Sequence, residues 1–267
     1  MKKFMALLLV AGMTLSLTAC GGSTDTAKKG QADGKDTFTV GFDQDFPPFG
    51  YVGDDGEFTG FDIEMATECA ARMGKKIVLQ PIDWDAKDME LEAGTIDCIW
   101  NGFTMNGRED QYTWTDPYMD NSQVVVVKKD SGINTLADLA GKVVEVQKES
   151  AAETALNDEE HADLTASFAQ LLSVGEYNTA FMDLESGAVD AVAIDIGVAQ
   201  FQIEGKEDQY QILDETISSE QYAVGFFLGN TALRDEVQST LSEMVEDGTF
   251  AEISNKYFGY DVCTLGK

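Results

Sequence analysis

Hydrophobic residues recur along this chain with two periods, which predict alternating strands and helices. Short, nearly continuous apolar runs are typical of strands buried on both faces of a parallel sheet. Longer stretches with apolar residues three or four positions apart predict amphipathic helices. In the first such helix Phe61, Met65, Cys69 and Met73 share one face, and Asp62 is placed to cap its start. We expect strands at 38–43, 76–82, 96–100, 124–127, 142–147 and 189–194, and C-terminal helices at 231–248 and 252–257.

One phrase of this pattern occurs twice. Residues 89–97 (MELEAGTID) and 182–190 (MDLESGAVD) share Met, Leu, Glu, Gly and Asp at equivalent positions. Such a repeat predicts two related α/β lobes, and the alternative, that many helices end at Gly before a strand, stays open. Gly102 and Asp195 follow the two copies by the same interval. Because ligands bind beyond the carboxyl ends of strands in open α/β sheets, we expect both residues at a cleft between the lobes.

The N-terminal region predicts export and a lipid anchor. Lys2 and Lys3 precede an apolar run that is shorter than the roughly 20 residues of a membrane span. We expect residues 1–19 to be a lipoprotein signal peptide, because LTAC at 17–20 resembles a bacterial lipobox in which Cys20 receives the lipid. Residues 20–36 then comprise the palmitate-bearing Cys and a flexible tether. The expected location is the extracytoplasmic face of the cell membrane; a plain secretory signal is the alternative.

The composition of the chain excludes several classes of protein. It has 267 residues, 43% of them hydrophobic, and 48 acidic residues outweigh 18 basic ones. A formal charge of −30 repels nucleic acid and anionic lipid, so we expect no nucleic-acid partner. His161, in an acidic stretch expected to face solvent, is the one histidine, which excludes a Ser/His/Asp triad and a histidine metal cluster. We therefore expect no catalytic residues, no cofactor and no metal.

Three further cysteines follow Cys20. Cys69 lies on the apolar face of the first helix and Cys98 in a buried strand, both in the expected first lobe. They could form a disulfide, or each could be a small buried hydrophobic side chain. Cys263 lies in the C-terminal tail, and we expect its thiol to be free.

Motifs in a fixed order resemble one family over most of the chain. They are GFDQDFPPF at 41–49, GFD at 60–62, DWD at 83–85, NGFTMNGR at 101–108, TDPY at 115–118, LADLAG at 136–141 and DG at 247–248. Together they resemble the bacterial extracellular solute-binding proteins of family 3, which bind polar amino acids for ABC importers. The resemblance implies an α/β, periplasmic-binding-protein-like fold of type II, with two lobes joined by two crossover hinge strands. Lobe 1 would comprise 37–126 and 221–267, and lobe 2 would comprise 127–220.

The resemblance also implies a function. The chain would be a monomer that binds a free amino acid between its lobes and delivers it to the permease subunits of an ABC transporter. Two other functions stay open. One is an enzyme on the same fold, such as a dehydratase, and the other is a receptor module that signals without transport.

The chemistry of a free amino acid indicates which residues would bind it. A buried carboxylate needs a fixed cation and a buried ammonium needs a fixed anion, since unpaired buried charges are very costly. Arg108 suits the carboxylate because its guanidinium donates two parallel hydrogen bonds, and Asp195 from the other lobe suits the ammonium. The backbone N–H groups of Ser150 and Ala151, at an expected helix start, also favour a carboxylate.

The remaining site residues come from the resemblance. It implies that Thr104 adds a hydroxyl and that Gly102 offers its carbonyl to the ammonium, with Asn101 beside it. Phe46 and Trp84 would form aromatic walls. Asp43 and Gln147 would meet the distal end of the ligand, and Asp43 favours a cationic or amide side chain there.

The motif around Arg108 departs from the family pattern. The family has Thr-x-Thr-x-x-Arg, whereas this chain has TMNGR at 104–108, which is one residue shorter. We expect Asn106 and Gly107 to make a tighter turn that restores the reach of Arg108.

Overall fold

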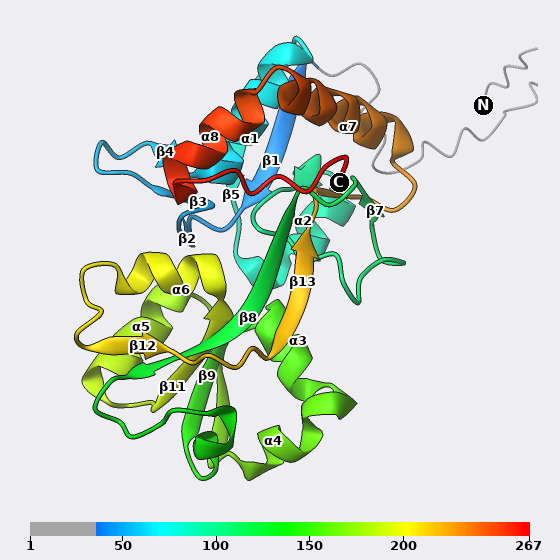
Figure 1. The fold of residues 1–267 in the computed structure, drawn as a ribbon. Helices are drawn as coiled ribbons and strands as arrows, with labels where there is room; N and C mark the ends of the chain where they lie inside the picture. The colour runs from blue at the N-terminus through cyan, green and yellow to red at the C-terminus, as the bar shows by residue number, and fades with distance from the viewer. Residues whose placement is uncertain (1–35) are drawn as a thin grey trace, which may run out of the picture.

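The computed structural model describes residues 36–267 as two α/β lobes joined by a pair of strands (Figure 1). The predicted signal peptide, Cys20 and nearly all of the predicted tether lie outside these residues. No helix between residues 36 and 267 is both long enough and apolar enough to cross a membrane. Each lobe is a sheet with helices on both faces, which is the α/β arrangement that the alternating pattern predicts.

The sheet of the first lobe has five strands in the order β5-β1-β6-β14-β7. Strand β1 pairs in parallel with β5 and β6, whereas β14 arrives from the C-terminal part of the chain and lies antiparallel between β6 and β7. The strand bounds are Thr37–Phe42 for β1, Lys76–Pro81 for β5, Cys98–Ile99 for β6, Thr113–Trp114 for β7 and Gly225–Phe226 for β14.

Two hydrophobic cores bind helices to this sheet, because adjacent strand residues point to opposite faces. Cys98 packs with Val40 and Met65 in one core, and Ile99 packs with Trp84 and Leu91 in the other. The first core is closed by α1 (Phe61–Arg72), α7 (Thr231–Glu246) and α8 (Thr249–Phe258), and the second by η1 (Trp84–Ala86) and α2 (Lys87–Ala93). A small sheet of β2 (Asp45–Phe46), β3 (Gly50–Val52) and β4 (Phe58–Thr59), which the pattern did not predict, completes the lobe.

The sheet of the second lobe has the order β10-β9-β11-β8-β12, and β13 also pairs with β8. Strand β9 is parallel to β10 and β11, and β8 is antiparallel to β11, β12 and β13. The strand bounds are Met119–Lys128 for β8, Val143–Gln147 for β9, Gln170–Val174 for β10, Ala191–Asp195 for β11, Tyr210–Ile212 for β12 and Ser218–Tyr222 for β13.

The run of four valines in β8 shows how this second sheet is covered. Val124 and Val126 belong to the core under α5 (Tyr177–Ser186) and α6 (Ile196–Ile203). Val125 and Val127 belong to the core on the opposite face. That face is covered by η2 (Leu136–Leu139), α3 (Ala151–Asn157), η3 (Glu159–His161) and α4 (Ala162–Ser167).

Strands β8 and β13 form the crossover between the lobes. They pair antiparallel from Met119 opposite Tyr222 to Gln123 opposite Ser218, and both run from one lobe into the other (Figure 1). At the first-lobe end, Met119 forms a β-bridge with Cys263 of the C-terminal tail. The lobe borders predicted at 126/127 and 220/221 fall inside these two continuous strands and stay a prediction.

Two expectations from the local pattern are corrected by the structure. Asp62 does not cap α1, because its carboxylate is fully buried and accepts hydrogen bonds from the Gly102 N–H at 2.6 Å and from the Tyr118 hydroxyl at 2.9 Å. Gly60 precedes the helix with φ 134°, and a Cβ there would lie 2.3 Å from the Phe49 carbonyl oxygen, so the start of α1 requires glycine. His161 ends η3 half-buried rather than facing solvent freely.

The cysteines of the described chain are free thiols. Cys69, Cys98 and Cys263 are all buried and none forms a disulfide. Of the two alternatives for Cys69 and Cys98, the structure favours small hydrophobic side chains in the core of the first lobe. Burial raises the pKa of Cys69 to about 12, which keeps that thiol protonated and unreactive.

Candidate ligand-binding site between the lobes

A cavity lies between the two lobes, at the carboxyl ends of β1, β6, β9 and β11. The residues that line it come from both lobes: Asp43, Phe46, Trp84, Asn101, Gly102, Thr104, Arg108, Gln147, Ser150, Ala151 and Asp195. The structure therefore brings together all eleven residues that the sequence predicted for a ligand site. Which part of a ligand each of them contacts stays a prediction.

The Arg108 guanidinium is held in place by backbone carbonyl groups of both lobes. It donates to the Thr104 carbonyl at 3.2 Å and, across the cleft, to the Glu149 carbonyl at 3.3 Å, and it lies 5.5 Å from the Phe103 ring centroid. These acceptors are neutral, and no carboxylate of residues 36–267 forms an ion pair with Arg108. Arg108 is half-buried, so it can meet an anion in the cavity.

The short motif before Arg108 forms the tight turn that its sequence predicts. The Arg108 N–H donates to the Met105 carbonyl at 2.9 Å, and Gly107 has φ 77°. The side-chain oxygen of Asn106 accepts from the Gln221 N–H at 2.8 Å, which fastens the turn to hinge strand β13. One residue fewer than in the family pattern therefore still places Arg108 on the cavity.

Ser150 and Ala151 form the predicted helix start on the second lobe. Ser150 is the N-cap of α3, and its hydroxyl oxygen accepts from the Glu153 N–H at 3.1 Å. Glu149, the preceding residue, has φ 61° and its N–H donates to the Glu153 carboxylate at 2.6 Å. This geometry aims the first turn of α3 at the cavity, opposite the Arg108 side chain.

Asp195 ends β11 and belongs to a buried network on the hinge strands. It accepts from Asn121 at 2.8 Å, from Gln123 at 2.7 Å and from the Tyr222 hydroxyl at 2.5 Å. The same two amides also donate to Glu220, which accepts a third bond from the cavity residue Thr104. Burial and then the charge of Glu220 raise the pKa of Asp195 to about 7.

Glu220 was not predicted from the sequence. It lies on hinge strand β13, 116 positions away from its partner Thr104, and no motif marks it. Its one local signal is that Glu220 and Tyr222 alternate on the inner side of a short strand that is otherwise polar.

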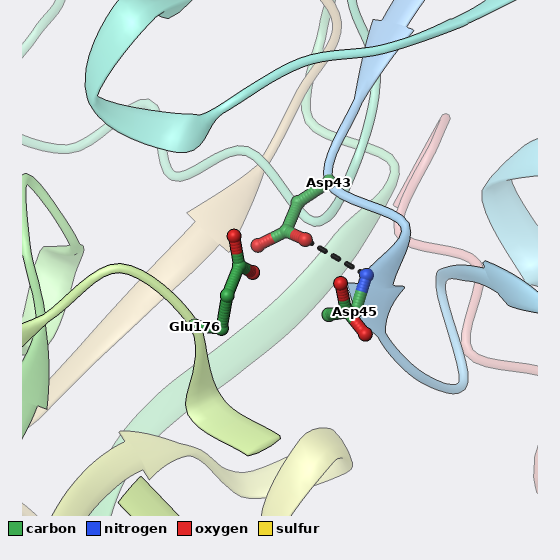
Figure 2. A group of neighbouring side chains, drawn as sticks. All are labelled: Asp43, Asp45 and Glu176. Atoms are coloured by element: carbon green, nitrogen blue, oxygen red, sulfur yellow. Dashed lines mark hydrogen bonds between the residues drawn. The ribbon is translucent and has the colours of Figure 1, made fainter. Parts of the chain in front are cut away.

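Carboxylates from both lobes gather at the other end of the cavity. Figure 2 shows Asp43 and Asp45 on one side and Glu176 facing Asp43 from the other; one carboxylate oxygen of each residue lies within 4.8 Å of one oxygen of each of the other two. Asp43 accepts from the Asp45 N–H at 2.8 Å and from the Gln147 amide at 2.6 Å. Such a group could bind a cationic side chain or a metal ion. Glu176, the N-cap residue of α5, was also missed by the sequence analysis.

Burial raises the pKa values of two members of this group, Asp43 and Glu176. Burial is the main cause for Asp43, whose exposed fraction is 2%. Burial and then the charge of Asp43 raise the pKa of Glu176 to about 8. At neutral pH the two carboxyl groups therefore hold a proton between them in the absence of a cation.

Aromatic rings and contacts across the cleft enclose the cavity. Trp84 is 9% exposed and meets the Phe103 ring edge-on at 5.4 Å, and Phe46 lies 6.0 Å from Tyr177 of the second lobe. Around the rim, Lys148 donates to Asp85 at 2.7 Å, and Asn178 and Gln147 reach Asp45 and Asp43. The two lobes are thus closed on each other.

The cavity is closed between two hinged lobes, and a positive charge of the first lobe and a negative charge of the second lobe face it. This arrangement defines a ligand-binding protein of the two-lobed class. Comparison with known sequences agrees. The model of the bacterial extracellular solute-binding proteins, family 3, matches residues 38–260. The chain belongs to this family.

Individual relatives cover nearly the whole chain. The L-cystine-binding protein TcyJ of Escherichia coli is 31% identical over 97% of this chain and 94% of its own length. The structure of an ABC uptake transporter substrate-binding protein from Streptococcus pneumoniae with bound histidine superposes with a TM-score of 0.82, at 35% identity over 86% of this chain and 95% of that one. A relative of another kind is the ancestral amino acid-binding protein AncCDT-1, a precursor of cyclohexadienyl dehydratase (TM-score 0.75, 28% identity, 83% and 95% coverage). These relatives are thus named as binding proteins, and one of them is also named as a precursor of an enzyme.

Proposed function

We propose that this chain binds a free, polar amino acid between its lobes and delivers it to the permease of an ABC importer without chemical change. The observation that carries the proposal is a pair of opposite charges on one cavity. Arg108 reaches the cavity from the first lobe and has no carboxylate partner among residues 36–267, and Asp195 reaches the cavity from the second lobe. An amino acid has one carboxylate and one ammonium on the same carbon, so it satisfies both residues at once.

The same arrangement couples binding to closure of the lobes. A ligand held by Arg108 alone or by Asp195 alone would leave a charged group unpaired in a low-dielectric site. Only the closed form pairs both groups, so the ligand favours it. The contacts of Lys148 with Asp85 and of Asn178 with Asp45 add to the same closed form.

Binding rather than turnover is favoured by the groups on the cavity. None of its eleven lining residues is a His, Cys or Lys, and the two acids, Asp43 and Asp195, are each held by at least two hydrogen bonds. Incubating the bound ligand with the protein and analysing it by mass spectrometry tests this point. Conversion of the ligand would establish an enzyme instead.

We also propose that Cys20 anchors the protein by a lipid on the extracytoplasmic face of the membrane, where it serves the permease as a monomer. The lipobox and the polar tether support this proposal. Cys20→Ser should abolish incorporation of labelled palmitate and leave the protein soluble or as uncut precursor. Equal labelling of the variant and the parent would refute the anchor. A signalling receptor without transport would be indicated if uptake of the ligand were unchanged after deletion of the protein.

The experiment that tests the amino-acid ligand is a screen of the purified protein. Mass spectrometry of co-purified small molecules identifies a candidate. A thermal-shift screen with the twenty standard L-amino acids and L-cystine then measures which of them raises the melting temperature. We expect one amino acid or one chemically related group to stand out. If none of them stabilises the protein, the proposed ligand class is wrong.

A further inference from the structure

Two carboxylates lie buried together where the cavity meets the hinge. Asp195 is 4% exposed and Glu220 is 6% exposed. The side-chain NH₂ groups of Asn121 and Gln123, both on hinge strand β8, each donate to both carboxylates at 2.7 to 2.8 Å. The two acids therefore share their donors: Asp195 on β11 and Glu220 on β13 lie on the two strands that pair with β8, and they meet at the amides of β8.

In the described part of the chain, the side chains that form hydrogen bonds with this pair are uncharged, and Arg108, which lines the same cavity, bonds to the Thr104 carbonyl instead. Asp195 also accepts from the Tyr222 hydroxyl of β13, and Glu220 accepts from the Thr104 hydroxyl at 2.8 Å. The other titratable side chain that faces them is Tyr177 of α5, whose pKa is raised well above its usual range by burial and then by the charge of Asp195. Within residues 36–267 neither carboxylate forms a hydrogen bond or an ion pair with Lys, Arg or His.

Around the two carboxylates, hydrogen-bond acceptors outnumber donors, and two further oxygen atoms add to this excess. The side-chain carbonyl oxygens of Asn121 and Gln123 are buried and have no hydrogen-bond partner. These side chains are themselves 4% and 0% exposed. Two buried negative charges without a cation are strongly unfavourable, so below about pH 7 one of the two carboxyl groups holds a proton before the ligand binds. An ammonium group, with a positive charge and three N–H donors, supplies what the region lacks.

We propose that Glu220 is a positioning residue that makes Asp195 exchange one proton for the ammonium group of the bound amino acid. This inference rests on the proposed function, in which Asp195 meets that ammonium. As the ligand binds, the carboxyl O–H bond of the pair breaks, its proton goes to the solvent, and the N–H groups of the ammonium take its place. No covalent bond to the ligand forms. Thr104 links Glu220 to the cavity, and Asn121 and Gln123 link it to the hinge.

The direction of the pH dependence follows from this exchange. Below pH 7 the pair is protonated before binding, so binding must release a proton and becomes weaker as the pH falls. Above pH 7 the proton is already gone, and the affinity reaches a plateau. For one proton and a pKa of about 7, the Kd at pH 6 is roughly tenfold higher than at pH 8.

The test compares unmodified protein with Glu220→Gln, which keeps the side-chain oxygen that accepts the three hydrogen bonds but removes the charge. The probe is the amino acid that stabilises the unmodified protein most in the thermal-shift screen at pH 8. Calorimetric titrations at pH 6, in phosphate and in imidazole buffer, count the protons released per ligand, and Kd is measured from pH 6 to 8. Removing the charge of Glu220 lowers the pKa of Asp195 while its burial remains, so the unmodified protein should release more protons than Glu220→Gln, whose Kd should depend less on pH.

Two more variants make the result specific. Glu220→Asp keeps the negative charge and should restore most of the proton release. Since Asp43 and Glu176 also share a proton near neutral pH, the comparison is repeated in Glu176→Gln, where the further change Glu220→Gln should remove the same amount.

Equal proton release by unmodified protein and Glu220→Gln would overturn the proposal and leave the proposed function standing. So would a Glu220→Gln variant that binds more weakly by the same factor at every pH, because that result indicates a purely structural role. If no amino acid in the screen binds, it is the proposed function that fails.

Discussion

Truncating Arg108 tests whether the cavity recognises the carboxylate of an amino acid. The side chain is half-buried, and it is held by two long hydrogen bonds to carbonyl oxygens rather than by a carboxylate. Arg108→Ala should therefore remove the proposed ligand contact without leaving a carboxylate of residues 36–267 unpaired. Loss of one member of a buried charge pair costs about 2–5 kcal/mol, and partial exposure places Arg108 near the lower end. We expect a loss of about 2–3 kcal/mol, roughly 30- to 150-fold in Kd.

Asp195, the residue proposed to bind the ammonium, should respond differently. Asp195 is almost fully buried, so Asp195→Asn should lie in the upper part of the same range. Because its raised pKa reflects burial beside Glu220, removing its charge should also leave the ligand-free protein as stable or more stable at pH 8. A large loss of affinity without loss of stability separates ligand recognition from misfolding.

Calorimetry with three ligands makes the assay chemically selective. Arg108→Ala should weaken binding of the amino acid far more than binding of its amide, which lacks the carboxylate. Asp195→Asn should weaken it far more than binding of the deaminated acid. Arg72→Ala is the matched control, since Arg72 pairs with Glu68 and Asp247 away from the cavity. If Arg108→Ala and Asp195→Asn both bind the amino acid with a Kd within about threefold of the parent, the difference in binding free energy is under about 0.7 kcal/mol. In that case Arg108 does not bind the carboxylate and Asp195 does not bind the ammonium.

Three further predictions concern the walls, the distal end and the support of the cavity. Trp84→Ala should remove most of the ligand-induced change in tryptophan emission and cost about 1–3 kcal/mol of binding, and a variant with full signal and affinity would contradict its role as a wall. Glu176→Gln should lower the preference for L-arginine over L-glutamine measured by calorimetry, because it removes a carboxylate that faces Asp43; an unchanged ratio of the two Kd values would exclude a cationic subsite there. Burial raises the pKa of Asp62 to about 7, above the roughly 3.9 of an unfolded chain, so the native state binds the extra proton and loses stability as the pH rises from about 4 to 7. Asp62→Asn should therefore raise the melting temperature more at pH 8 than at pH 5, and the opposite order in calorimetric scans would refute this reasoning.

Much of the site was predictable because its residues follow strand ends. Asp43, Gln147 and Asp195 each lie at or just after the carboxyl end of a buried apolar run, and a parallel strand delivers such residues to one edge of its sheet. The turn at Asn106 and Gly107 was predictable from its residue types alone. These features depend on short stretches of chain, which the hydrophobic pattern describes directly.

The residues that were missed depend on contacts between distant segments. Glu220 acts through Thr104, Asn121 and Asp195, and Glu176 faces Asp43 only because two lobes close on each other. Asp62 is a residue for which the local prediction was wrong because tertiary contacts decide its role. Its position at the start of a helical pattern favours a cap, but it lies in the first turn of α1, and tertiary structure buries its carboxylate against Gly102 and Tyr118 instead. The local preference for Asp as a helix cap does not hold at this position, because the carboxylate bonds to residues 40 and 56 positions away.

The place of β14 in its sheet has a consequence for how the molecule is made. It separates β6 from β7, so the central part of the first sheet is incomplete until residues Gly225–Phe226 have been added. The strands of the second sheet, by contrast, all lie between Met119 and Tyr222 and are present earlier. During synthesis, which begins at the N-terminus, the second lobe is therefore complete before the first. Until β14 is made, the edges of β6 and β7 that pair with it stay unpaired. Those open edges are the part of the nascent protein most exposed to mispairing with other chains, and so the part that gains most from a chaperone.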